Sequence, residues 1–152
     1  MKKTVMCLLL VFALAGLSGT GFAQLKYGTD FTASDAVWSV THIKVKSNMI
    51  PYYLEGIKKT WVTGNEVAKE LGQLEDWAIY SSLLGDSGEY NLTLVIEFKD
   101  LAQYDKGRKE FKAFEELWLK KISEEKREEI VKTYPEMREI VGEYLVRKLD
   151  FM

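Results

Sequence analysis

The stretch from Gly88 to Lys99, GEYNLTLVIEFK, decides the fold. Within it apolar side chains alternate with mostly polar ones, which is the two-residue period of a β-strand with two different faces. The apolar set is Tyr90, Leu92, Leu94, Ile96 and Phe98, and the other set is Asn91, Thr93, Val95 and Glu97. No other segment specifies a strand as clearly. We therefore expect this segment to be the central strand of a small sheet.

The N-terminal residues have the pattern of an export signal. Lys2 and Lys3 precede an apolar run from Val5 to Ala15, and small residues follow it. These features predict a bacterial-type signal peptide over residues 1–23, and hence a periplasmic or secreted protein. An uncleaved anchor is the alternative, but the run is too short for a stable membrane span.

Composition excludes several classes of function. The single cysteine, Cys7, lies inside the predicted signal, so the mature chain would lack disulfides and thiolate chemistry. Without Lys2 and Lys3 the chain has 19 basic and 23 acidic residues, a net charge near −4. We therefore expect no nucleic-acid partner. The polar, Gly/Ser/Thr/Asp-rich composition of residues 24–35 predicts an irregular lead-in. Residues 36–152 are long enough to form one domain with an ordinary hydrophobic core.

The remaining elements follow in a simple order. Further strands are predicted over residues 36–46, 76–84 and 139–151, and a four-residue turn at 85–88 would make the second one a hairpin partner of the opening stretch. A long helix is predicted from Met49 to Gly72, with a stripe that includes Leu54, Ile57, Gly64 and Leu71. A second helix begins at Asp100, bends near residues 122–123 and stops at Pro135.

This succession indicates a ferredoxin-like α+β domain. The order βαββαβ, with an extra helical segment before the last strand, and right-handed crossovers predict a four-stranded antiparallel sheet in the order 4-1-3-2. Both helices would cover one face. The order and the strand-to-helix stretch VIEFKDLAQY (95–104) resemble the dimeric α/β-barrel superfamily. That resemblance implies a homodimer in which two open sheet faces meet; the superfamily includes small monooxygenases, isomerases, haem-handling enzymes and proteins of no known activity.

Strand parity divides the side chains between the two faces of the sheet. The set expected under the helices is Ile43, Val45, Leu92, Leu94, Ile96, Tyr144 and Val146. The set expected on the open face is Trp38, Val40, His42, Tyr80, Ser82, Asn91, Thr93, Val95, Glu97, Glu143, Leu145 and Arg147. Polar groups among aromatic ones suit a small-ligand pocket. The ligand-binding candidates are Trp38, His42, Tyr80, Asn91, Thr93, Glu97, Glu143 and Arg147.

Two of these residues are the catalytic candidates. His42, the only histidine, could act as a base or bind haem iron, or could be a plain hydrogen-bonded sheet residue. Glu97 could share the open face with Glu143 and Arg147, either as a carboxylate of raised pKa or as part of a cross-strand ion pair. One histidine excludes a multi-histidine metal site, so no metal is predicted. Tyr52 and Tyr53 could rim a pocket or simply pack.

Two functions remain open at this stage. The first is an exported dimeric barrel that binds a small, largely apolar ligand over the open sheet face. The alternative is a non-enzymatic homodimeric interaction or structural domain with no pocket. Sequence patterns decide neither enzymatic activity nor a cofactor, since phosphate-binding loops, nucleophile elbows and zincin helices are all missing from the sequence.

Overall fold

The computed structural model describes residues 24–82 and 89–152. The predicted signal peptide and the hairpin turn at 85–88 lie outside these ranges. The strands are β1 (Phe31–Ala33), β2 (Val37–Val45), β3 (Asp76–Ser81), β4 (Leu92–Phe98), β5 (Arg138–Val146) and β6 (Leu149–Phe151). The helices are α1 (Ile50–Ile57), α2 (Thr63–Glu70), α3 (Leu101–Tyr104), α4 (Arg108–Lys121), α5 (Glu124–Val131) and α6 (Tyr134–Met137). Within the described ranges, no helix is both long and apolar enough to cross a membrane.

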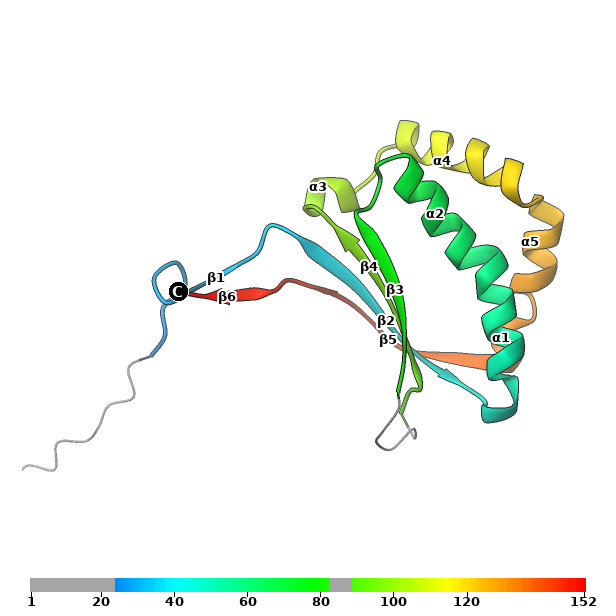
Figure 1. Ribbon diagram of the computed structural model, residues 1–152, viewed down its shortest axis with the longest axis horizontal. Helices are drawn as coiled ribbons and strands as arrows, with labels where there is room; N and C mark the ends of the chain where they lie inside the picture. Colours follow the sequence, from blue (N-terminus) through cyan, green and yellow to red (C-terminus); the bar gives the residue numbers. More distant parts are fainter. Residues whose placement is uncertain (1–23, 83–88) are drawn as a thin grey trace, which may run out of the picture.

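A four-stranded antiparallel sheet in the order β3-β4-β2-β5 forms the centre of the domain. The helices lie on one side of this sheet, and the other side is bare (Figure 1). β4, the predicted central strand, lies between β3 and β2. The predicted α+β class with an antiparallel sheet is therefore confirmed.

The first helix is continuous, and its buried stripe agrees with the expected one at Ile57 and Gly64 but not at Leu54 and Leu71. Leu54 and Leu71 are 38 % and 37 % exposed, whereas Tyr53 and Ile57 are almost fully buried. A π-helical turn at Lys58–Val62 separates α1 from α2. Such a turn holds more residues than an α-helical one, so it rotates the face that follows it. Tyr53, which precedes the π-helical turn, is a core residue, and Tyr52 is exposed.

The second helical region is broken into four pieces. As expected, Asp100 caps α3, because its Oδ1 accepts a hydrogen bond from the Gln103 backbone N–H at 2.8 Å. The chain then leaves the helix, and α4 begins only after Gly107 in extended conformation. The predicted bend is confirmed at residues 122–123, where Ser123 caps α5. Pro135 does not end a helix but lies in the first turn of α6, where a missing N–H is tolerated.

The two ends of the described chain form a second, two-stranded sheet, which the sequence pattern did not predict. Residues 24–35 are not wholly irregular, because β1 pairs with β6 and places Phe31 opposite Phe151. The predicted last strand is correspondingly split into β5 and β6 around residues 147–148. The resulting ribbon projects from the main sheet (Figure 1).

The faces of β5 are the reverse of those expected. Val40 pairs with Tyr144 and Trp38 pairs with Val146, so these two β5 residues lie on the open side. Glu143 and Leu145 therefore share the side that faces the helices. A bulge between His42 and Ile43 adds one residue to β5, and one added residue exchanges the two faces of everything beyond it.

The hydrophobic core lies between β2, β4 and the helices. Ile43, Leu92 and Leu94 pack with Tyr53, Ile57 and Tyr134 in one cluster. Val37 and Phe98 pack with Ala68 and Leu74 in the other. The face predicted for Leu92, Leu94 and Phe98 is thus observed. Tyr90 was wrongly assigned to this side, because it precedes β4 and its ring stacks on His42 of the open face.

Candidate ligand-binding site

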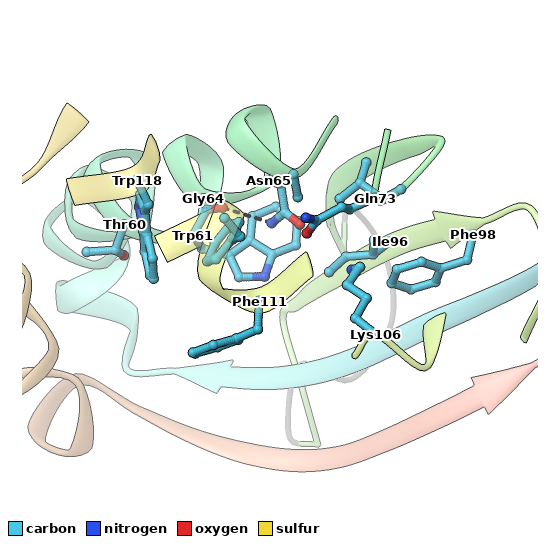
Figure 2. A pocket seen from close by; sticks show the side chains of 13 residues that line it. Thr60, Trp61, Gly64, Asn65, Gln73, Ile96, Phe98, Lys106, Phe111 and Trp118 are labelled. Carbon is cyan, nitrogen blue, oxygen red and sulfur yellow. Dashed lines mark hydrogen bonds between the residues drawn. The ribbon is translucent and has the colours of Figure 1, made fainter. Parts of the chain in front are cut away.

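A mainly apolar hollow lies on the helix-covered side of the sheet. A cavity of about 300 Å³ opens between α2, α4 and the end of β4 (Figure 2). This volume lies at the lower end of the range for small-molecule pockets. Its walls are mainly apolar and aromatic. The lining residues are Thr60, Trp61, Gly64, Asn65, Ala68, Gln73, Leu74, Ile96, Phe98, Lys106, Phe111, Phe114 and Trp118.

Loose packing of α4 creates this cavity. α4 has fourteen residues and none of them is buried, although its apolar side carries Phe111, Phe114 and Trp118 toward the domain. Phe111 remains 60 % exposed. A Cβ atom added at Gly64 of α2 would lie 3.4 Å from the Trp118 ring, so the two helices touch at this glycine. Away from that contact, α4 leaves aromatic surface uncovered.

Most polar groups around the cavity are already hydrogen-bonded. The Gln73 Nε2 donates to the Glu110 carbonyl and the Asn65 Nδ2 to the Trp61 carbonyl, each at 2.8 Å. Thr60 Oγ1 lies 2.6 Å from the Tyr134 hydroxyl. In the described part of the chain, the buried Trp118 Nε1 has no hydrogen-bond partner. The walls therefore offer few free polar groups to a ligand.

Lys106 is the charged residue of the cavity. It lies in the three-residue break between α3 and α4, and its Nζ is 4.9 Å from the centroid of the Phe98 ring. The side chain is partly buried, and this burial lowers the pKa of the Lys106 amine below its usual value. The cation–π contact with Phe98 holds the amine beside the apolar wall.

The open side of the sheet carries an aromatic cluster around His42. The Tyr90 ring stacks on the imidazole with centroids 4.1 Å apart, and the Tyr144 ring lies at 5.7 Å. The His42 Nδ1 is 3.0 Å from Thr93 Oγ1. Tyr144 also covers Gly142, where an added Cβ would meet its ring within 3 Å. His42 is thus a hydrogen-bonded and stacked residue of the sheet.

Five sequence-predicted candidates share this open side. Trp38 pairs with Glu97, His42 with Thr93, and Tyr80 with Thr93 across the sheet. A shallow hollow of about 130 Å³ lies against Trp38, Tyr80 and Glu97. The two catalytic candidates are not adjacent, because the register separates Glu97 from the partner of His42 by four residues along β4. They do not form an acid–base pair.

The other three candidates lie elsewhere. Asn91 bonds both backbone groups of Val45, accepting from its N–H at 2.9 Å and donating to its carbonyl at 2.7 Å. It therefore extends the sheet instead of facing a ligand. Glu143 faces the helix side, and Arg147 is exposed between β5 and β6. In residues 24–82 and 89–152, no ion pair joins Glu97, Glu143 and Arg147.

Sequence reasoning missed the cavity and Lys106. Residues 100–122 were expected to form one helix, in which Lys106 would lie in a solvated run of charges. Gly107 was the available signal, because glycine disfavours a helix interior and permits the break that turns Lys106 toward the sheet. Within the described residues, no group of three or more His, Cys, Asp or Glu side chains could hold a metal ion.

Comparisons with known proteins concern the fold. No protein-family model and no curated protein matches the chain. A crystal structure of HapK from Hahella chejuensis is 13 % identical and superposes with a TM-score of 0.43, covering 74 % of this chain and 91 % of that one. A dimeric ferredoxin-like protein of unknown function from Thermobifida fusca is 11 % identical (TM-score 0.37; 85 % and 97 % covered).

A third neighbour comes from Bacteroides fragilis and is described as a dimeric protein of unknown function with a ferredoxin-like fold. It is 9 % identical, with a TM-score of 0.39, and the match covers 79 % of this chain and 99 % of that one. Two of these structures are thus described as dimeric and ferredoxin-like.

Proposed function

We propose that the protein is an exported homodimer that binds a small, largely apolar ligand in the cavity between α2, α4 and β4. The observation that carries this proposal is the cavity itself, together with the half-exposed aromatic side of α4. Apolar surface left in water costs about 25 cal/mol per Å². A ligand that covered Phe111, Phe114 and Trp118 would recover that free energy. The basic and apolar N-terminal pattern supports export.

The open face of the sheet supports the dimer. Trp38, Val40 and Val95 of β2 and β4 are only half-buried there, and Tyr144 and Val146 of β5 are 55 % and 43 % exposed. A continuous apolar sheet face of this kind favours a protein partner. A second copy would bring an identical face, which gives the self-complementary contact of a two-fold dimer.

A site over the open sheet face is the second candidate. The stack of Tyr90, His42 and Tyr144 favours it, since flat rings arranged around an imidazole could hold a flat apolar ligand in the space between two subunits. The hollow beside Trp38 and Glu97 is small in one protomer, and closure by the second would enlarge it. This is the location that the sequence patterns predict.

The experiment measures binding of an environment-sensitive apolar dye to the purified protein. Phe111→Glu places a carboxylate at the mouth of the cavity, on a residue exposed enough to tolerate it, and should reduce dye binding at least tenfold with an unchanged circular dichroism spectrum. Leu119→Glu is the matched control, because Leu119 is an exposed residue of α4 outside the cavity.

Two outcomes would overturn the site. If Phe111→Glu binds dye as the original protein does while His42→Ala loses binding, the open face is the ligand site. If the dye binds to neither face, and native mass spectrometry shows a dimer without a bound molecule, the chain is a homodimeric structural domain.

A further inference from the structure

We propose that the ligand of this cavity is an amphipathic organic anion, with an apolar body against the aromatic wall and a carboxylate paired with Lys106. This inference rests on the proposed function and names its ligand class. It starts from a contrast in the lining. Of the thirteen lining residues, Lys106 is the one with a charged side chain, and the other twelve are apolar or neutral.

The amine of Lys106 points into the cavity. Figure 2 shows its side chain rising from the α3–α4 break between Phe98 and Phe111, with the amine end beside Ile96. The contact with the Phe98 ring fixes the last methylenes in this direction. A surface lysine ordinarily keeps its amine in water. Here the amine is turned toward the domain instead.

No carboxylate of the described residues satisfies this amine. The ion pairs formed there involve other lysines and arginines, and none includes Lys106. Glu110, in the first turn of α4, places its Oε2 2.9 Å from where a Cβ atom at Gly107 would lie. Burial is also the one cause that moves the pKa of Lys106, which agrees with the lack of a nearby carboxylate.

An amine that loses water without gaining a counter-ion is unfavourable by itself. An anionic ligand would supply the missing partner, and a charge-assisted hydrogen bond to a carboxylate is stronger than a neutral one. The amide nitrogens of Asn65 and Gln73 donate to backbone carbonyls, so they do not compete for the anion. The polar contact of the ligand is thus predicted at Lys106.

The rest of the cavity suits an apolar body. Trp61 packs edge-on against Trp77 with centroids 5.6 Å apart, and Phe114 lies against Trp118 at 5.0 Å. The lining rings come from different walls: Trp61 from the π-helical turn before α2, backed by Trp77 of β3, and the Phe114–Trp118 pair from α4. A chain or ring that enters between them would be covered on both sides. The ligand class is therefore a monocarboxylate with an aliphatic or aromatic body.

The test compares decanoate with decanol by isothermal titration calorimetry at pH 7.5. Both probes have the same apolar chain, and only decanoate carries a charge at this pH. The original protein should bind decanoate about tenfold more tightly than decanol. Lys106→Met should bind the two equally, and Lys106→Arg should retain the preference. Lys112→Met, an exposed lysine of α4 outside the cavity, is the matched control and should behave as the original protein.

The outcomes separate the two proposals. If the original protein binds both probes equally, or Lys106→Met keeps the preference for decanoate, the anion proposal is wrong and the apolar cavity stands. If the dye binds but neither probe displaces it, the proposed ligand class is wrong; if the dye does not bind either, the ligand-binding function itself fails. If decyl sulfate or decyl phosphate is preferred over decanoate by tenfold, the anion is not a carboxylate.

Discussion

The two faces of the same sheet differ in what covers them. On the helix side, Val37, Ile43 and Val45 of β2 are each 1 % exposed. On the open side, Trp38, Val40 and His42 of the same strand are only half-buried. Alternate residues of one strand thus experience a dry core and a wet surface. The difference teaches that a hollow and a bare surface are separate features. The cavity of about 300 Å³ lies where helices cover the sheet, and the hollow against Trp38 and Glu97 on the bare face measures about 130 Å³.

The largest expected effect distinguishes the faces directly. Leu94 is 6 % exposed in the core, so Leu94→Asp should bury an unpaired carboxylate and destabilise the fold by about 4 kcal/mol or more. Glu97→Gln, on the open face of the same strand, should leave the free energy of unfolding within about 0.5 kcal/mol. Urea denaturation measures both. Equal destabilisation would contradict the face assignment.

The next prediction concerns the open face as the surface of the proposed dimer. Val95→Lys introduces an amine into the centre of that face, opposite Val40. We expect the original protein to sediment as a dimer at micromolar concentration in analytical ultracentrifugation, and Val95→Lys to sediment as a monomer without loss of secondary structure. Leu119→Lys is the control, since it adds the same charge to exposed α4. A dimer that survives Val95→Lys would place the contact elsewhere.

A smaller effect is expected from the hydrogen bond between the buried hydroxyls of Thr60 and Tyr134. The Thr60 hydroxyl donates its single proton to the Gly56 carbonyl at 3.1 Å. The Tyr134 hydroxyl must therefore donate to Thr60 Oγ1. Tyr134→Phe should therefore destabilise the protein by about 1 kcal/mol. Thermal or urea unfolding at pH 7 measures this loss, and Tyr52→Phe, at an exposed position of α1, is the control and should be neutral.

The same tyrosine gives a pH dependence. Burial raises the pKa of Tyr53 and Tyr134 above the usual 10.0. The folded protein therefore holds protons that the unfolded chain releases, so stability is complete below pH 10 and falls as the pH rises through the folded values. Tyr134→Phe should lessen this fall. An identical slope in the variant would contradict the assignment.

The smallest effect belongs to Lys106. Burial lowers its pKa from 10.5, so without ligand the charge slightly destabilises the folded state. Because the unfolded chain binds this proton more tightly, stability should rise with pH in the window between the lowered pKa and 10.5. Lys106→Met should remove that rise, as urea unfolding at several pH values in this window would show. A variant less stable than the original would mean that the amine has a structural role.

Periodic elements were predictable from sequence, and local irregularities were not. The alternation in 88–99 placed β4 correctly, and the Asp100 capping motif placed the start of α3. Three single-residue or single-turn events escaped the pattern: the π-helical turn at 58–62, the bulge opposite His42 and the helix break at Gly107. Each interrupts the regular repeat of a helix or strand. The spacing of apolar residues reveals such a repeat but does not show where it is interrupted.

These irregularities also determined what could be predicted of the site. The bulge moved Glu143 to the helix side, because it exchanged the faces of β5 beyond Gly142. Asn91 left the candidate set because its side chain bonds the backbone of Val45, a contact 46 residues distant in sequence. Lys106 became a site residue because it lies in the break between α3 and α4, next to Gly107, and lines the cavity. Long-range pairing decides the positions of Glu143 and Asn91, whereas the position of Lys106 follows from a local break beside a glycine.

The β1–β6 ribbon determines how the protein responds to a pulling force. Phe31 lies opposite Phe151, and the pairing continues from Ser34, which bonds Lys148, into the antiparallel β2–β5 pair. The two ends of the described chain therefore leave from the same end of one long antiparallel pair. A load applied between these ends would break the interstrand hydrogen bonds one after another. It would not load many of these bonds at the same time. The protein should thus be mechanically soft when stretched from its termini, and β5 should detach before the covered face is disturbed.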